Sequence, residues 1–150
     1  MGQRHVRSAA SRGASAPLRG RGRGLKVLLD THALLWAAQG RLRGHVGHVI
    51  EETADAVYVS AATIWEIEIK RALRRLRAPQ DTATLVDASG FRRLNISYEH
   101  ALEAGRLPPI HADPFDRMLV AQARLEGMTL ATGDAQVRRY DVALLTVTVD

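Results

Sequence analysis

From residue 25 onward, short apolar runs alternate with segments of helical periodicity, and this alternation constrains the fold more than any other feature. The runs LKVLL, AVYV, MTLA and VALLTV are short and apolar, as expected for buried strands. Strands that alternate with helices indicate βαβ units and a parallel sheet covered on both faces. We therefore expect an α/β fold with strands over 25–29, 56–59, 91–95, 128–131 and 142–147, and helices over 32–38, 45–54, 61–76, from Pro79 and Asp81 to about 89, 98–105 and 115–126.

Capping residues define several of these helix ends. Ser60 suits the N-cap of the helix over 61–76, and Gly127 suits the end of the helix over 115–126. In the segment DPFDR, Asp113 fits an N-cap and Pro114 fits the first helical position. This assignment puts Asp116 in the first turn, with its carboxylate free to point elsewhere than the cap.

Two further acids follow predicted strands directly. Asp30 ends the first apolar run, and Asp134 comes shortly after the run MTLA. Ligands of open parallel sheets bind beyond the carboxyl ends of the strands, so both acids fall on the functional edge. Each has a simpler alternative role, because Asp30 and Asp134 could merely cap the helices that follow them.

The segment AATIWEIEIK offers two acids, and periodicity does not choose between them. Glu66 and Glu68 lie on opposite rims of the apolar face of a helix over 61–76. Glu66 could also form an exposed pair with Lys70, four residues later. The predicted apolar face is centred on Ala61, Ala62, Trp65, Ile69, Ala72 and Leu76.

Carboxylates gathered at one sheet edge repel each other, by roughly 3 kcal/mol for a pair at about 5 Å and an effective dielectric constant near 20. A fold keeps such a cluster when cations neutralise it, and carboxylate oxygens suit the hard ions Mg²⁺ and Mn²⁺. Cysteine is absent, which excludes a thiolate nucleophile and a zinc–thiolate site. The pattern therefore indicates metal-dependent phosphate chemistry, with Asp113, Thr31 and Thr132 as auxiliary groups beside the ligands.

Other conspicuous side chains have simpler roles. His32 and His111 do not stand at metal-ligand spacing with another histidine, so we expect helix-start or packing use for His32 and a loop role for His111. Trp36 and Trp65 are expected in the core or at a dimer face rather than as platforms for stacked bases.

The basic charge of the chain lies mostly in its first 24 residues. This segment holds six arginines and no acid, which leaves about −1 of the total +5 for residues 25–150. Its Arg-, Gly- and Ser-rich composition predicts disorder. It could be an RNA-contacting arm, a targeting peptide or, as we favour, sequence upstream of a natural start near Leu25.

The cluster Lys70, Arg71, Arg74, Arg75 and Arg77 could be a solvated helix face or a phosphate-facing patch.

Four segments together resemble the PIN-domain ribonuclease toxins of VapC type: LLLDTHALLW, VSAATIWEIEIK, HADPFDRMLVAQA and TLATGD. The resemblance covers nearly all of residues 25–150, which we expect to form one PIN domain. It implies an α/β/α sandwich with a mostly parallel sheet of about four to five strands. It also implies that Asp30, Glu66, Asp116 and Asp134 bind Mg²⁺ or Mn²⁺, which selects Glu66 over Glu68.

The same resemblance implies a function and partners. The chain is expected to hydrolyse RNA phosphodiester bonds to 5′-phosphate and 3′-hydroxyl ends, to form a homodimer and to be blocked by a VapB-like antitoxin. No apolar run approaches the 18 residues of a membrane span, so no membrane-spanning segment is expected. The absence of cysteine fits a reducing cytosol, and we expect a cytoplasmic protein. One alternative is a catalytically silent PIN-like module that binds RNA or a partner. Transfer through an aspartyl-phosphate fits poorly, because His32 stands where that chemistry needs a second aspartate.

Overall fold

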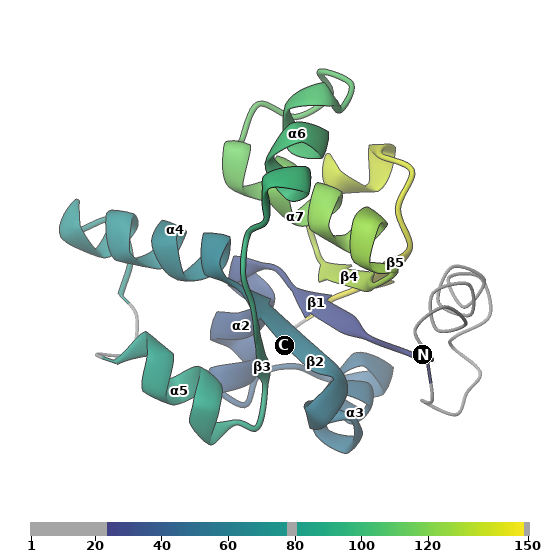
Figure 1. The fold of residues 1–150 in the computed structure, drawn as a ribbon. Helices are drawn as coiled ribbons and strands as arrows, with labels where there is room; N and C mark the ends of the chain where they lie inside the picture. The colour runs from purple at the N-terminus through teal and green to yellow at the C-terminus, as the bar shows by residue number, and fades with distance from the viewer. Residues whose placement is uncertain (1–23, 78–80, 149–150) are drawn as a thin grey trace, which may run out of the picture.

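The computed structural model describes residues 24–77 and 81–148. Nearly all of the expected disordered segment, residues 1–23, lies outside this range. The described chain contains a five-stranded sheet with helices on both faces (Figure 1). Its strands are β1 (Val27–Leu29), β2 (Val57–Ser60), β3 (Arg92–Leu94), β4 (Thr129–Thr132) and β5 (Leu144–Thr146).

Every strand pair in the sheet is parallel, and the order is β3-β2-β1-β4-β5. The predicted mostly parallel sheet of four to five strands is therefore confirmed. The chain proceeds from β1 to one side and later returns to the other, so the order reverses between β1 and β4. Such a switch point leaves a crevice beyond the carboxyl ends of its two strands.

The predicted helices are all present, with differences at their ends that are largest for the helix predicted over 61–76. They are α2 (Thr31–Ala38), α3 (Gly44–Glu52), α4 (Ala61–Ala72), α5 (Thr82–Ala88), α6 (Tyr98–Arg106) and α7 (Pro114–Glu126), with short 3₁₀ turns at Ala54–Ala56 and Val137–Arg139.

Side-chain alternation along the strands explains the two apolar layers. In β1, Val27 and Leu29 pack on one side with α2, α3 and the start of α4, whereas Leu28 packs on the other side with α6 and α7. Both faces of the central strand β1 are buried, so β1 is apolar throughout instead of alternating with polar residues, whereas the edge strand β3 carries two exposed arginines. The α/β/α arrangement expected from the motifs is confirmed (Figure 1).

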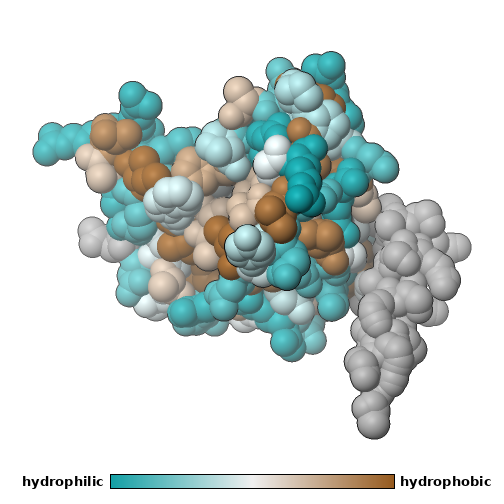
Figure 2. Space-filling view, turned by 45° about the horizontal axis from the view of Figure 1, so that its top comes forward, coloured by the Kyte–Doolittle hydropathy of each residue, from teal (hydrophilic) through white to brown (hydrophobic). Residues whose placement is uncertain are grey.

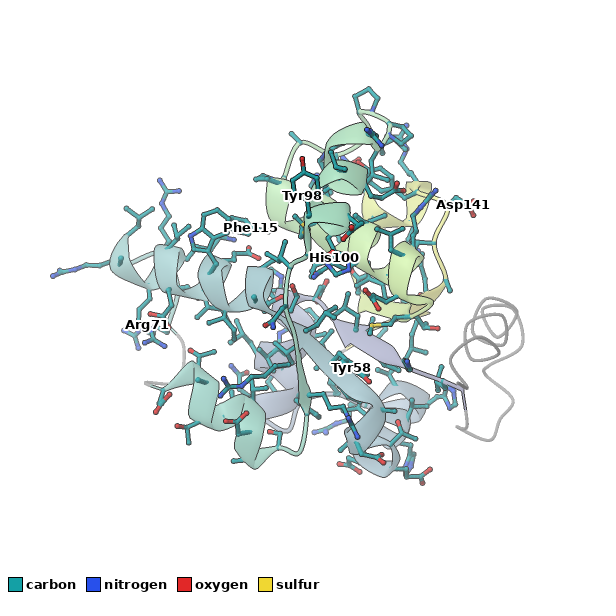
Figure 3. The ribbon with its side chains drawn as sticks, viewed as in Figure 1. Tyr58, Arg71, Tyr98, His100, Phe115 and Asp141 are labelled. Atoms are coloured by element: carbon teal, nitrogen blue, oxygen red, sulfur yellow. The ribbon has the colours of Figure 1, made fainter. Side chains whose placement is uncertain are left out.

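Helix α6 is held to α7 by a polar network around His100. Nδ1 of His100 accepts from the backbone N–H of Ser97, and the Ser97 hydroxyl accepts from the backbone N–H of His100, which completes a capping box. The other ring nitrogen lies 2.8 Å from Glu126 at the end of α7. His100 sits between the two helices (Figure 3).

Helix α4 differs most from its predicted form. It ends at Ala72, four residues early, because the chain turns at Arg74 with a left-handed φ of 57° and the Arg75 N–H donates to the Lys70 carbonyl over 2.8 Å. The predicted apolar face was also wrong, since Trp65 is 60% exposed. The buried residues of this helix are Ala62, Thr63, Glu66 and Ile67.

Trp65 is exposed because α4 lies at the edge of the fold. Its first turns pack against α2 and α7, and its last turn projects away from the sheet (Figure 1). Hydrophobic residues reach the surface near the projecting end of α4, and a second hydrophobic patch lies near the centre of the face that Figure 2 shows. Exposed large apolar side chains of the described residues are Trp65, Leu73, Ile96, Tyr98, Leu102 and Leu125.

Candidate active site at the carboxyl ends of β1 and β4

A pocket at the switch point between β1 and β4 gathers the predicted acids. All four candidate ligands and the auxiliary Asp113 line it, although they come from separate parts of the chain. Its other lining residues include Thr31, Lys70 and His111. The carboxylates of this pocket, named here the acid pocket, are Asp30, Glu66, Asp113, Asp116 and Asp134.

Asp30 is buried directly after β1 and does two things at once. One carboxylate oxygen accepts from the Ala33 N–H over 2.8 Å, so Asp30 is the N-cap of α2, as its simpler reading predicted. Thr132 hydrogen-bonds the same carboxylate. Burial raises the pKa of Asp30, and these two hydrogen bonds offset only part of that effect. Capping therefore occupies one oxygen of a carboxylate that still faces the pocket.

Glu66 is the acid of α4 that enters the pocket. Its side chain is buried, with Oε1 accepting from the Thr31 hydroxyl over 2.5 Å and Oε2 lying 2.6 Å from Lys70 Nζ. Glu68 is half exposed and pairs with Arg71 instead. The pair of Glu66 with Lys70 exists as expected, but it lies at the pocket and not on an open helix surface.

The DPFDR segment correctly predicted which of its two aspartates caps α7. Asp113 Oδ1 accepts from the N–H groups of Phe115 and Asp116, which makes it the N-cap of α7. Asp116 then points away from the cap, with Oδ2 3.0 Å from His111 Nε2. Burial, followed by repulsion from Asp113 and Asp30, raises the pKa of Asp116 to about 7.

Asp134 is the most open of the four candidate ligands, with a side chain that is 35% exposed. Its Oδ1 accepts from the Gln136 N–H over 2.7 Å, and its own N–H donates to the Thr132 hydroxyl. Thr132 therefore bridges the ends of both central strands, because it also contacts Asp30. The predicted auxiliary threonines do lie beside carboxylates, Thr31 at Glu66 and Thr132 at Asp30.

Two pocket residues that pair with the candidate ligands, His111 and Lys70, were not among the predicted site residues, although the cluster that contains Lys70 was considered as a phosphate-facing patch. His111 was expected to have a loop role, but the turn before α7 folds it back so that Nε2 lies 3.0 Å from Asp116 and 3.3 Å from Asp134. Lys70 reaches the pocket because it follows Glu66 by one helical turn, and this spacing was a usable signal. His111 had no comparable signal, since its placement depends on the conformation of the 107–113 loop.

The donor set fits a hard divalent cation. Its oxygens belong to partly desolvated carboxylates, and burial raises the pKa of two of them, Asp30 and Asp116. Hydroxyl groups orient Asp30 and Glu66, as outer partners do in metal sites. Within the described residues, His111, Asp116 and Asp134 form a trio whose potential ligand atoms all lie within 4.8 Å of one another.

The raised pKa of Asp116 predicts a specific pH dependence for the metal-free protein. Between the ordinary value of 3.8 and about 7, the folded protein keeps this proton while the unfolded chain has lost it. Stability should therefore fall as pH rises through this interval. In thermal melts with EDTA, the decrease in melting temperature from pH 5 to pH 8 should be smaller in Asp116→Asn than in the unmodified protein. Equal decreases would contradict the assignment of this titration to Asp116.

A model of the PIN domain family matches residues 27–143. A comparison with curated proteins finds no match. Similar solved structures include DNA-bound VapBC from Salmonella typhimurium, with a TM-score of 0.62 and 18% identity over 81% of this chain and 98% of that one. VapBC2 from Rickettsia felis bound to a promoter DNA fragment has a TM-score of 0.62 and 14% identity, over 83% of this chain and 100% of that one. A toxin–antitoxin complex from Klebsiella pneumoniae has a TM-score of 0.59 and 20% identity, over 81% of this chain and 97% of that one. At these identities the likeness is one of fold.

Proposed function

This chain belongs to the PIN domain family, and we propose that it is the toxin of a toxin–antitoxin pair and acts as a metal-dependent endoribonuclease. The match over residues 27–143 confirms the family predicted from the four motifs, and members of this family are nucleases. The observation that carries the proposal is the acid pocket, in which carboxylates from four segments converge at the sheet's switch point.

We assign the metal to Asp30, Glu66, Asp116 and Asp134. When bound, Mg²⁺ or Mn²⁺ would lower the pKa of a water molecule and neutralise charge on the phosphate. The carboxylates act as fixed acceptors whose orientation Thr31 and Thr132 maintain.

In the proposed reaction, water attacks phosphorus and the bond from phosphorus to the 3′ oxygen breaks. The products then carry 5′-phosphate and 3′-hydroxyl ends. Lys70 Nζ, at the rim beside Glu66, is available to bind a phosphate oxygen. The chemistry needs no side-chain nucleophile, and the chain has no cysteine.

The proposed partners follow from the fold neighbours and the surface. The Salmonella and Rickettsia structures are VapBC assemblies, which supports a VapB-like antitoxin for this chain. Exposed Trp65, Tyr98 and Ile96 supply apolar surface for a homodimer.

No helix of the described residues is both long and apolar enough to cross a membrane. We propose the cytoplasm, where RNA targets are available, as the site of action.

Cleavage of labelled single-stranded RNA by the purified protein tests the function. Cleavage should require Mg²⁺ or Mn²⁺, stop on addition of EDTA and resume when the ion is restored. A protein that binds RNA without cutting it under any of these conditions would instead fit the silent binding module. Cleavage that EDTA does not affect would contradict the metal assignment.

RNA is proposed to leave the pocket along the end of α4, where Arg74 and Arg75 are exposed one turn beyond Lys70. In an Asp116→Asn background, changing both arginines to serine should weaken RNA binding and reduce the slope of log K against log salt by about 0.7 for each lost phosphate contact. Arg92→Ser is a control for loss of an arginine remote from the pocket, because Arg92 is exposed at the start of β3, at the amino-terminal ends of the strands, where it donates to the Asp55 carbonyl. Equal salt slopes in the two variants would favour a merely solvated helix end.

A further inference from the structure

The loop that carries His111 is fixed by two side chains outside the acid pocket. The Tyr140 hydroxyl accepts from the His111 backbone N–H over 2.9 Å. Arg117 adds hydrogen bonds of 2.8 to 3.0 Å to three carbonyls at the end of α6 and the start of this loop, those of Ala104, Leu107 and Pro108. The backbone position of His111 is therefore determined by the packing of α6 against α7, independently of the carboxylates.

The imidazole of His111 has different partners at its two nitrogens. Nδ1 accepts from the Asp113 backbone N–H over 3.3 Å. A ring nitrogen that accepts from an N–H carries a lone pair, so the proton of the neutral ring is on Nε2. That nitrogen lies 3.0 Å from Asp116 Oδ2 and 3.3 Å from Asp134 Oδ2. Both carboxylate oxygens can accept the Nε2–H.

We propose that His111 is a positioning residue, which holds the carboxylates of Asp116 and Asp134 together through its Nε2–H and does not itself bind the metal. The proposal rests on the proposed function, because it concerns residues assigned there as metal ligands. A ring nitrogen that carries a proton has no lone pair to offer an ion. His111 therefore belongs beside the ligand set, although its distances alone would also allow it to be a ligand.

Asp134 explains why such a residue is needed. It follows β4 on a turn, and its Oδ2 has no hydrogen-bond partner among the described residues other than His111. The Gln136 N–H fixes only the other oxygen. Without His111, the Asp134 carboxylate would lose its link to α7 and to Asp116. His111 thus joins the two halves of the site that come from β4 and α7.

The tautomer can be measured directly, before any metal is added. Long-range ¹H–¹⁵N spectra of the metal-free protein at pH 8 should show His111 protonated at Nε2 and unprotonated at Nδ1. The same pattern should persist with saturating Mg²⁺, because the ion does not replace the proton. A proton on Nδ1, or loss of the Nε2 proton on addition of Mg²⁺, would overturn the proposal. The metal-free spectrum decides the matter even if the protein cleaves no RNA, so the two proposals can fail separately.

Variants at His111 provide a second test, with Mn²⁺ affinity measured by calorimetry. Glutamine can place an amide N–H near the position of Nε2 but has no imidazole nitrogen for a metal. His111→Ala should weaken Mn²⁺ binding by about 10- to 100-fold, the range typical of lost outer partners, and His111→Gln should recover most of it. His48→Gln, at an exposed position on α3, is the matched control for removal of an imidazole. Equal losses in the alanine and glutamine variants, or no loss in either, would contradict the positioning role.

Discussion

Replacing Asp116 by asparagine is expected to abolish metal-dependent RNA cleavage and growth inhibition on expression. Loss of an outer partner of a metal site typically costs 10- to 100-fold, so loss of a proposed ligand should cost at least about 100-fold. Asparagine keeps the size of the side chain, removes the charge and replaces one carboxylate oxygen with an NH2 donor. The variant should remain folded, because the partly buried Asp116 carboxylate is repelled by Asp113 and Asp30 and its pKa is raised to about 7. Initial cleavage rates and thermal melts in the same buffer check both statements.

Asp113→Asn is the matched control for this experiment. Asparagine caps a helix about as well as aspartate, so the start of α7 is preserved while a neighbouring charge is removed. We expect a much smaller loss of activity than for Asp116→Asn. Asp30→Asn also keeps a capping group and should nevertheless be inactive, since Asp30 is assigned to the metal. Toxicity at the unmodified level in Asp30→Asn or Asp116→Asn would refute that assignment.

The second large effect is expected at α4, where two glutamates lie two residues apart. Glu66→Gln removes a buried charge that Thr31 and Lys70 both contact, so metal binding and cleavage should fall by at least about 100-fold. Glu68→Gln removes a half-exposed charge that pairs with Arg71 and accepts a long hydrogen bond from Thr82, and such surface pairs contribute about 0–1 kcal/mol. Its activity should stay within about fivefold of the unmodified protein, the factor that corresponds to about 1 kcal/mol.

Calorimetric titration with Mn²⁺ distinguishes these two variants without relying on a substrate. Heat of binding should disappear in Glu66→Gln and persist in Glu68→Gln. The opposite result would transfer the ligand role to Glu68, and equal heats in both would remove α4 from the metal site. Lys70→Met helps to interpret a loss, since it removes the cation beside Glu66 and retains the carboxylate.

The type and order of the secondary structure were predictable because they depend on local patterns. Short apolar runs predicted the strands, and the parallel sheet followed from their alternation with helices. Capping chemistry correctly predicted Ser60, Asp113 and Gly127 at their helix ends. The end of α4 carried no such signal, because a non-glycine residue, Arg74, takes the left-handed conformation there.

The site was only partly predictable, because its assembly depends on tertiary packing. Asp30 and Asp134 could be placed from topology alone, as each follows a central strand. The direction of the Glu66 side chain could not be predicted from the sequence. It depends on how α4 packs, since only the side of its first turns that faces α2 and α7 is buried. That same packing leaves Trp65 against Phe115 at the surface, where periodicity predicted an apolar face. His111 reaches the pocket only through the loop that Arg117 and Tyr140 hold.

The most direct test of the central proposal is the chemistry of RNA ends formed in cells. Brief induction of the protein should create new RNA molecules with 5′-phosphate ends at discrete positions, and induction of Asp116→Asn at equal abundance should create none. Sequencing of 5′-phosphate ends from both cultures measures this. New ends that carry 5′-hydroxyl groups, or identical ends in the two cultures, would contradict RNA hydrolysis by the acid pocket.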